Sequence, residues 1–275
     1  MLKKTKRIII ISILLYLLLI TWQVFAGIND NLGVLPKNGK VSDASVQLFF
    51  SLQPNGWDEN VIVEIVMMAL LPTLGAGLYI YLKNNGMFAD VQQRIDYSAF
   101  LKKGLTNSFL VATLISVFTN IYRLGLINWF YYPLVFQMQP AQIYRDARPG
   151  YFSSNELIDV IFYIIFAAIG WGIFAVLIFS VGLFVKKNAL FYIMGPIIAI
   201  ALILFALLGN LQNPVWYTIA NISFPFTILA PGQFALGSRI PILNSYLIFF
   251  VTVILYLLVT ITLVTTWYKR KRKLG

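Results

Sequence analysis

Long apolar runs divide this chain, and they constrain its fold more than any other feature. Residues 8–26 form the first run, with 19 residues and no charge. A helix needs about 20 apolar residues to cross a bilayer. Further runs predict membrane-spanning helices at residues 61–82, 105–124, 157–185, 189–208 and 243–267. The sequence therefore predicts an all-α polytopic membrane protein with six transmembrane helices, forming a single domain over residues 1–275.

The overall composition agrees with this fold class and excludes several functions. The chain is 59% hydrophobic and 11% charged, whereas soluble domains are about 25% charged. It contains no cysteine and no histidine, which removes disulfides, thiolate catalysis and imidazole chemistry. A nucleotide-binding Gly-x-x-x-x-Gly-Lys-Ser/Thr loop is also missing from the sequence. We therefore expect no catalytic site, cofactor site or metal site on this chain.

The first apolar run has an alternative interpretation as a secretory signal. Residues 24–26 resemble a small-residue cleavage site. However, the run is longer than the usual signal core of about 7–15 residues. A retained transmembrane helix is therefore the favoured interpretation.

The distribution of charge predicts the orientation in the membrane. Suppose that both chain ends lie on one side of the membrane. That side then contains residues 1–7, residues 83–104, the turn at 186–188 and the tail at 269–273. Together these segments carry 15 of the 21 Lys and Arg residues. That side carries two acidic residues, and the opposite side carries eight. By the positive-inside rule, the N- and C-termini are predicted to be cytoplasmic. The positive net charge then reflects topology, and nucleic acid is not needed to explain it.

Residues 210–241 lie outside the membrane by this count but are too apolar for an ordinary loop. Four prolines in this segment prevent one continuous helix. Re-entrant half-helices packed into the outer leaflet would explain the composition. An aromatic loop at the membrane interface is the alternative.

Residues 83–104 form a polar elbow between the second and third predicted spans. Phe88, Val91 and Ile95 recur at helical spacing and predict a short amphipathic helix. Asp96 or Ser98 would cap a second helix that continues into the third span. The elbow is predicted either to dock a partner protein or to lie as a solvated segment on the membrane surface.

Two isolated charges stand near the outer ends of spans. Glu64 and Arg123 lie where the second and third spans would meet. They are candidates for an outer gate or a substrate contact. An interfacial ion pair, or snorkelling of Arg123 to the headgroups, is the structural alternative.

With these features in view, the chain resembles the permease subunit of a bacterial type-2 ABC transporter, an exporter-like family. The resemblance includes the six-span layout and a loose pattern after the elbow helix, formed here by Arg94, Tyr97, Phe100 and Lys103. It also includes the basic turn before the fifth span, with Pro196 inside that span. The seven residues before the first span are fewer than the amphipathic N-terminal helix that many members have.

The resemblance implies a membrane subunit without catalytic activity, paired with a second permease that is identical or related. Ala168, Gly172 and the fifth span are the predicted faces between the two permeases. A separate ATPase dimer, which holds ATP and Mg, would dock beneath them. The implied docking residues are Phe88, Asp90, Val91, Arg94, Ile95 and Asp96 of the elbow, and Lys186, Lys187 and Asn188 of the turn.

The resemblance further implies export of an amphipathic or hydrophobic substrate, such as a peptide, bacteriocin, drug or lipid-linked molecule. The location would be the plasma membrane of a bacterium, with a single-membrane, Gram-positive-like cell expected. Because no ionisable residue lies midway along the predicted spans, ion coupling is disfavoured and the energy would come from the ATPase. The alternative function is that of a non-transporting membrane protein, such as an assembly factor or sensor subunit.

Overall fold

The computed structural model describes residues 2–31, 44–53, 59–85, 96–138, 152–208, 212–232 and 242–272. These residues are almost entirely helical. The helices are α1 (Leu2–Asn31), α2 (Ala44–Ser51), α3 (Glu59–Asn84), α5 (Tyr97–Phe130), α7 (Glu156–Gly182), α8 (Asn188–Tyr192), α9 (Met194–Leu207), α10 (Pro214–Ser223), α11 (Phe226–Leu229) and α12 (Ser245–Arg272).

Five of the described helices are long and apolar enough to cross a membrane, namely α1, α3, α5, α7 and α12. Each corresponds to one of the predicted spans, although residues 183–185 of the span 157–185 follow α7 and residues 243–244 of the span 243–267 precede α12. The predicted fifth span, 189–208, is instead divided into α8 and α9, with Ile193 leaving helical geometry between them. Pro196 lies in the first turn of α9, where its missing N–H costs little. The structure therefore does not confirm a single spanning helix at this position.

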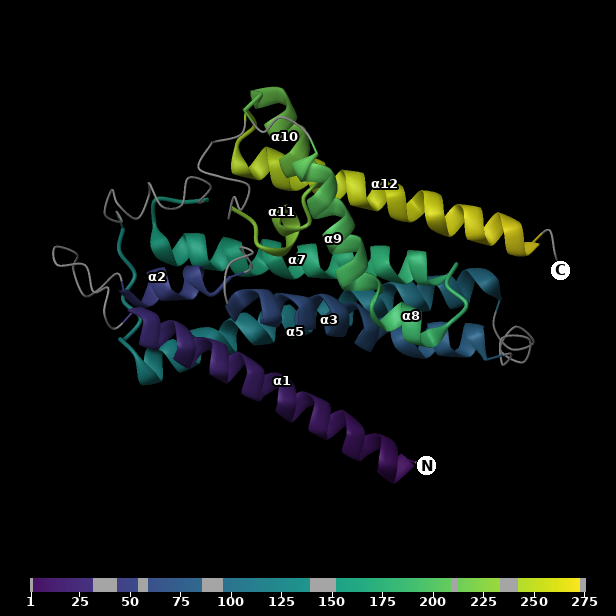
Figure 1. Ribbon diagram of the computed structural model, residues 1–275, viewed down its shortest axis with the longest axis horizontal. Helices are drawn as coiled ribbons and strands as arrows, with labels where there is room; N and C mark the ends of the chain where they lie inside the picture. Colours follow the sequence, from purple (N-terminus) through teal and green to yellow (C-terminus); the bar gives the residue numbers. More distant parts are fainter. Residues whose placement is uncertain are drawn as a thin grey trace.

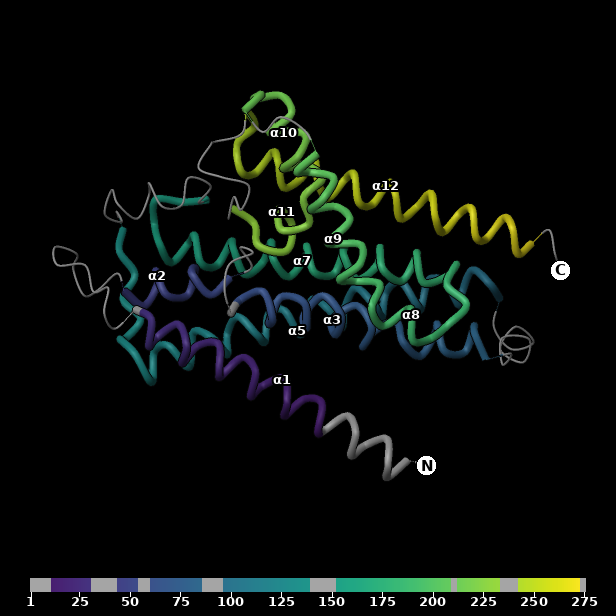
Figure 2. The backbone as a smooth tube through the Cα atoms, in the orientation of Figure 1, coloured from purple at the N-terminus to yellow at the C-terminus, as the bar shows by residue number. Residues whose placement is uncertain are grey.

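The helix α7 lies at the centre of the molecule. Helices α3, α5 and α7 run side by side along the long axis, α12 packs on α7, and α1 lies on the opposite side beside α3 and α5 (Figure 1). Trp171, Phe174 and Phe179 of α7 are buried in the common core. Followed towards the N-terminus, α1 runs to the same end of the bundle as the C-terminal end of α12 (Figure 2). We call this the terminal end, and we call the other end, where α2 lies, the α2 end.

Small residues allow these helices to approach closely within the chain. A Cβ atom on Gly172 would lie 2.6 Å from the Phe109 ring of α5, and the neighbouring Ala168 is buried. The predicted role of Ala168 and Gly172 as a face between two permeases is therefore wrong, because α5 of the same chain already covers that side of α7. A Cβ on Gly170 would overlap the carbonyl of Ile228 in α11, at 1.8 Å.

The helix α3 continues without interruption through Pro72. Proline has no N–H, so the carbonyl oxygen of Met68 loses its helical partner. Gly195 of α9 lies directly against that oxygen, because a Cβ on Gly195 would be only 1.8 Å from it. The proline in α3 and the glycine in α9 therefore form one contact site between the two helices.

Two segments outside the long helices contain short packed helices. The first, α2, lies within residues 27–60 and buries Phe49 and Phe50 against Tyr163 of α7. The second contains α10 and the four-residue α11, which is fully buried against α7 and α12. The Tyr256 hydroxyl of α12 donates to the backbone oxygen of Ser223 at 3.0 Å and fixes the end of α10.

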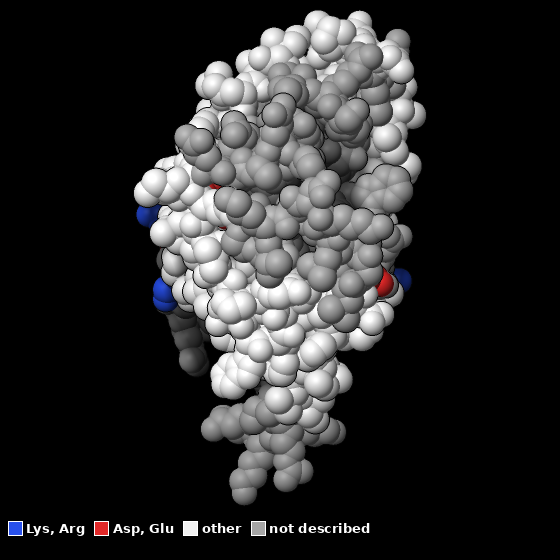
Figure 3. Space-filling model, turned by 90° about the vertical axis from the view of Figure 1, so that its left-hand side faces the viewer, with Lys and Arg blue, Asp and Glu red and all other residues white. Residues whose placement is uncertain are grey.

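The α2 end of the molecule shows few charged side chains on its described surface (Figure 3). At the terminal end, the described charges are mainly basic and include the last turn of α12, Lys269–Arg272. This asymmetry has the direction that the sequence predicts.

Candidate functional site

Arg123 lies inside the bundle near the α2 end, with only 1% of its surface exposed. Its Nε and Nη2 donate to Oε1 of Gln23 at 3.2 and 2.8 Å, and its Nη1 donates to Oε1 of Gln53 at 3.1 Å. Nη2 also lies 3.8 Å from the Met67 sulfur. Snorkelling of Arg123 to the headgroups is thereby excluded, because the guanidinium is held in the interior.

The two glutamines connect Arg123 to four further segments. Gln23 Nε2 donates to the Leu52 carbonyl at 2.9 Å and to Oδ1 of Asn60 at 2.5 Å. Gln53 Oε1 also accepts from the Tyr163 hydroxyl at 2.8 Å. The Arg123 cluster, which we define as Gln23, Gln53, Asn60, Arg123 and Tyr163, therefore joins α1, the end of α2, α3, α5 and α7.

Glu64 also lies close to this cluster. It is 4% exposed, and its charge acts on the Arg123 guanidinium. Removing a cation from water costs on the order of several kcal/mol. Hydrogen bonds and a nearby opposite charge must offset this cost. The structure thus brings the two predicted outer residues into one electrostatic neighbourhood. The hydrogen bonds of the guanidinium, however, go to the glutamine side chains.

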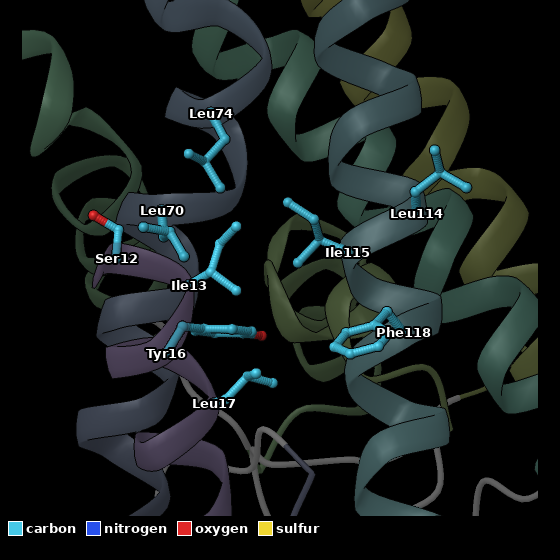
Figure 4. Close-up of a pocket in the computed structure, with 9 residues that line it drawn as sticks. All are labelled: Ser12, Ile13, Tyr16, Leu17, Leu70, Leu74, Leu114, Ile115 and Phe118. Carbon is cyan, nitrogen blue, oxygen red and sulfur yellow. The ribbon is translucent and has the colours of Figure 1, made fainter. Parts of the chain in front are cut away.

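An apolar groove of about 340 Å³ runs between α1, α3 and α5. Ile13 and Leu17 of α1, Leu70 of α3, and Ile115 and Phe118 of α5 point towards its centre (Figure 4). Its rim includes exposed apolar residues, such as Leu74 and Leu114. It lies midway along three apolar helices, at the depth where a bilayer would present acyl chains.

The groove and the Arg123 cluster are neighbours. The Tyr16 ring crosses the groove, and its hydroxyl forms a 2.6 Å hydrogen bond with Oγ1 of Thr119, one helical turn before Arg123. Helix α5 also buries the Ser116 hydroxyl and Oδ1 of Asn120, and neither atom has a hydrogen-bond partner in the described structure. An apolar groove thus leads into a stripe of buried polar groups on α5.

At the terminal end, the structure describes four of the predicted docking residues. Asn188 accepts from Nδ2 of Asn84 at 2.7 Å, so the turn before α8 lies against the end of α3, next to the elbow. Lys186 and Lys187 are exposed beside it. Phe88, Asp90, Val91, Arg94 and Ile95 lie outside the described residues.

Asp96 is the N-cap of α5, as the sequence predicts. Its Oδ2 accepts from the Ser98 hydroxyl at 2.5 Å and from the Ser98 N–H at 3.4 Å. The Ser98 hydroxyl, together with the backbone N–H groups of Ser98 and Tyr97 and the nearby charge of Arg272, lowers the pKa of this exposed carboxyl. Asp96 therefore fixes the start of α5 and is exposed at the terminal end.

Sequence reasoning did not find the partners of Arg123. Gln23 stands within an otherwise apolar run, and this isolated amide was a usable signal, since a polar group in a membrane helix needs a partner. Gln53 and Tyr163 gave no comparable signal, because Gln53 lies within the polar segment between the first two predicted spans and Tyr163 lies in an aromatic-rich span. Among the described residues, no group of acidic side chains could hold a metal ion.

No protein-family model, curated protein or solved structure matches this chain.

Proposed function

We propose that this chain is the permease subunit of an ATP-binding-cassette transporter that exports an amphipathic or hydrophobic substrate. The observation that carries the proposal is the junction between the apolar groove and the Arg123 cluster. A molecule with an apolar chain and a polar head needs both environments side by side. The groove would take the apolar chain from the bilayer, and the polar stripe on α5 would take the head.

In this proposal the α2 end faces outward and the structure represents an outward-closed state. Arg123 holds α5 to α1 and α2 through Gln23 and Gln53. Opening an exit would require these hydrogen bonds to separate, with Glu64 stabilising the guanidinium during the change. Glu64 and Arg123 would thus act as the outer gate.

The driving force would enter at the terminal end, which we place in the cytoplasm. The hydrogen bond between Asn84 and Asn188 connects the elbow side of α3 to the turn before α8. A partner that pushes on the elbow and on this turn would therefore move α3 and α8 together. We place an ATPase dimer there and a second permease beside this chain, in a bacterial plasma membrane.

We further assign residues 210–241 to a re-entrant element that precedes the last span, α12. Two observations favour this over an interfacial loop. All four residues of α11 are buried, and Ile228 of α11 touches Gly170, which lies midway along α7. A surface loop would not reach this depth.

The first test is a pulldown of the tagged chain in mild detergent, with and without Arg94→Glu plus Asp96→Lys. An ATP-binding-cassette protein should co-purify with the native chain and be lost with the variant. If the ATPase binds both, the docking residues are wrong. If no ATPase binds in several detergents, the non-transporting alternative replaces this proposal.

The second test concerns the groove in the reconstituted complex. Ile13→Trp would fill the groove, whereas Leu258→Trp places the same bulk on the lipid-facing side of α12, where Leu258 is similarly exposed. Stimulation of ATP hydrolysis by an alkyl-chain amphiphile should fall in the first variant alone. Equal stimulation in both variants would show that the substrate does not use this groove.

A further inference from the structure

A second pocket, of about 410 Å³, lies at the terminal end, between the end of α3, the segment after α7 and the last turns of α12. Four of its lining residues are cationic, namely Lys83, Lys186, Arg270 and Lys271, and none is acidic. Trp267, which is 3% exposed, also lines it. We call this the basic pocket. It is separate from the groove and from the Arg123 cluster.

The position of Lys83 is fixed by the backbone. Its Nζ donates to the carbonyl oxygens of Gly182 and Leu183 at 3.0 Å each and of Val185 at 2.6 Å. These three bonds use all three ammonium protons, and they cap the carboxyl end of α7. Lys83 therefore adds positive potential to the basic pocket, while direct contacts with a ligand are left to the other cations.

The pocket holds like charges close together. Lys271 lies near enough to Lys83 for the two charges to repel one another, and Lys186 and Arg270 add to the same field from separate segments. Repulsion of this kind is relieved when an anion binds between the charges. A phosphate group offers several acceptor oxygens, which suit an arginine and two lysines.

The depth of the pocket indicates the source of the phosphate. It lies where the apolar parts of α3, α7 and α12 end, and Trp residues favour the boundary between hydrocarbon and headgroups. Leu183 and Phe184 add apolar surface to the lining. We propose that the basic pocket binds the phosphate of an anionic lipid headgroup, with the lipid's acyl chains lying in the bilayer beside it. This inference does not depend on the transport function.

The test measures lipid binding to the purified full-length chain by native mass spectrometry. Phosphatidylglycerol is titrated against phosphatidylcholine with the same acyl chains. The pocket variant is Lys186→Gln plus Arg270→Gln, and the matched control is Lys187→Gln plus Lys269→Gln. The control removes the same charge from adjacent positions that do not line the pocket.

The pocket variant should bind phosphatidylglycerol about tenfold or more weakly, since each basic residue contributes about 1 kcal/mol to such binding. The control should weaken binding much less, because its two side chains do not line the pocket, and phosphatidylcholine binding should be weak and unaffected. Lys186 and Arg270 are exposed, so the double variant is expected to fold. Lys271→Gln, tested alone, should weaken binding in the same direction.

Three outcomes would overturn the proposal. Equal weakening in the pocket and control variants would mean that charge acts without a defined site. Displacement of the lipid by millimolar inorganic phosphate would assign the pocket to a free anion. If the pocket variant keeps its lipid affinity but loses a co-purifying ATPase, the pocket is a protein contact, and the proposed transport function survives.

Discussion

Arg123 and Gln23 should be strongly coupled in stability, because the guanidinium is buried and Gln23 accepts two of its hydrogen bonds. Gln23→Leu would leave the cation without this acceptor, and breaking a buried charge contact of this kind costs about 3–5 kcal/mol. Arg123→Met removes hydrogen bonds worth about 1.5–3 kcal/mol each but also removes a desolvated charge, so its net cost should be about 2–4 kcal/mol.

The double variant should cost much less than the two single variants together. Once Arg123 is gone, Gln23→Leu no longer strands a cation, and it also removes the amide oxygen that Arg123→Met leaves unsatisfied. We expect a coupling free energy of about 2–3 kcal/mol. The assay is SDS-induced unfolding in mixed micelles, followed by the fluorescence of the chain's six tryptophans.

A neutral pair between the same two helices provides the control. The hydroxyls of Thr21 and Tyr122 lie 2.8 Å apart, and neutral hydrogen bonds between membrane helices average about 0.6 kcal/mol. The cycle of Thr21→Val and Tyr122→Phe should give a value of that size. If the cycle of Gln23 and Arg123 gives no more than this control, the buried guanidinium is not what holds α1 to α5.

Three further outcomes are expected. Gly195→Ala should lower the thermal midpoint in detergent because its methyl would collide with the Met68 carbonyl, whereas Gly77→Ala, whose nearest neighbour would be 3.9 Å away, should not. Lys83→Met should destabilise the end of α7 by about 1.5–3 kcal/mol, because the contacts with the backbone carbonyl oxygens are lost. Lys187→Met should change little, and limited proteolysis of this segment would measure the difference. The lowered pKa of Asp96 means that its capping contribution is present above the ordinary aspartate pKa and is lost as the pH falls through the lowered value. Hydrogen exchange at the start of α5 should therefore show acid-induced fraying in the native chain, and an Asp96→Asn variant should lose that pH dependence.

The long helices were predictable because burial in a bilayer imposes a simple rule of length and composition on each segment. Asp96 was predictable for a different reason, since a cap depends on neighbours in sequence. The break at Ile193 was not predictable from the sequence. It falls in a continuous apolar run, and it reflects how α9 packs across α3. Local pattern contains no information of that kind.

The short helix α2 and the Arg123 cluster were not predicted from the sequence because both depend on packing between distant segments. An eight-residue segment is too short to form a stable helix alone, so α2 depends on Phe49 and Phe50 packing against Tyr163. Gln53 reaches Arg123 because that packing positions it. Arg123 is visible in the sequence as an isolated charge, but tertiary structure decides which residues surround it.

The shortness of α9 has a consequence for the surrounding lipid. A helix of 14 residues is about 21 Å long, whereas the hydrocarbon layer is about 30 Å thick. It also crosses α7 obliquely (Figure 1), and its outer side exposes Ile197, Ile200 and Leu204. The hydrophobic belt of the protein is therefore narrower beside α9 than beside α5 or α12. The bilayer must become thinner there to match it, so lipids with shorter acyl chains should be favoured beside α9.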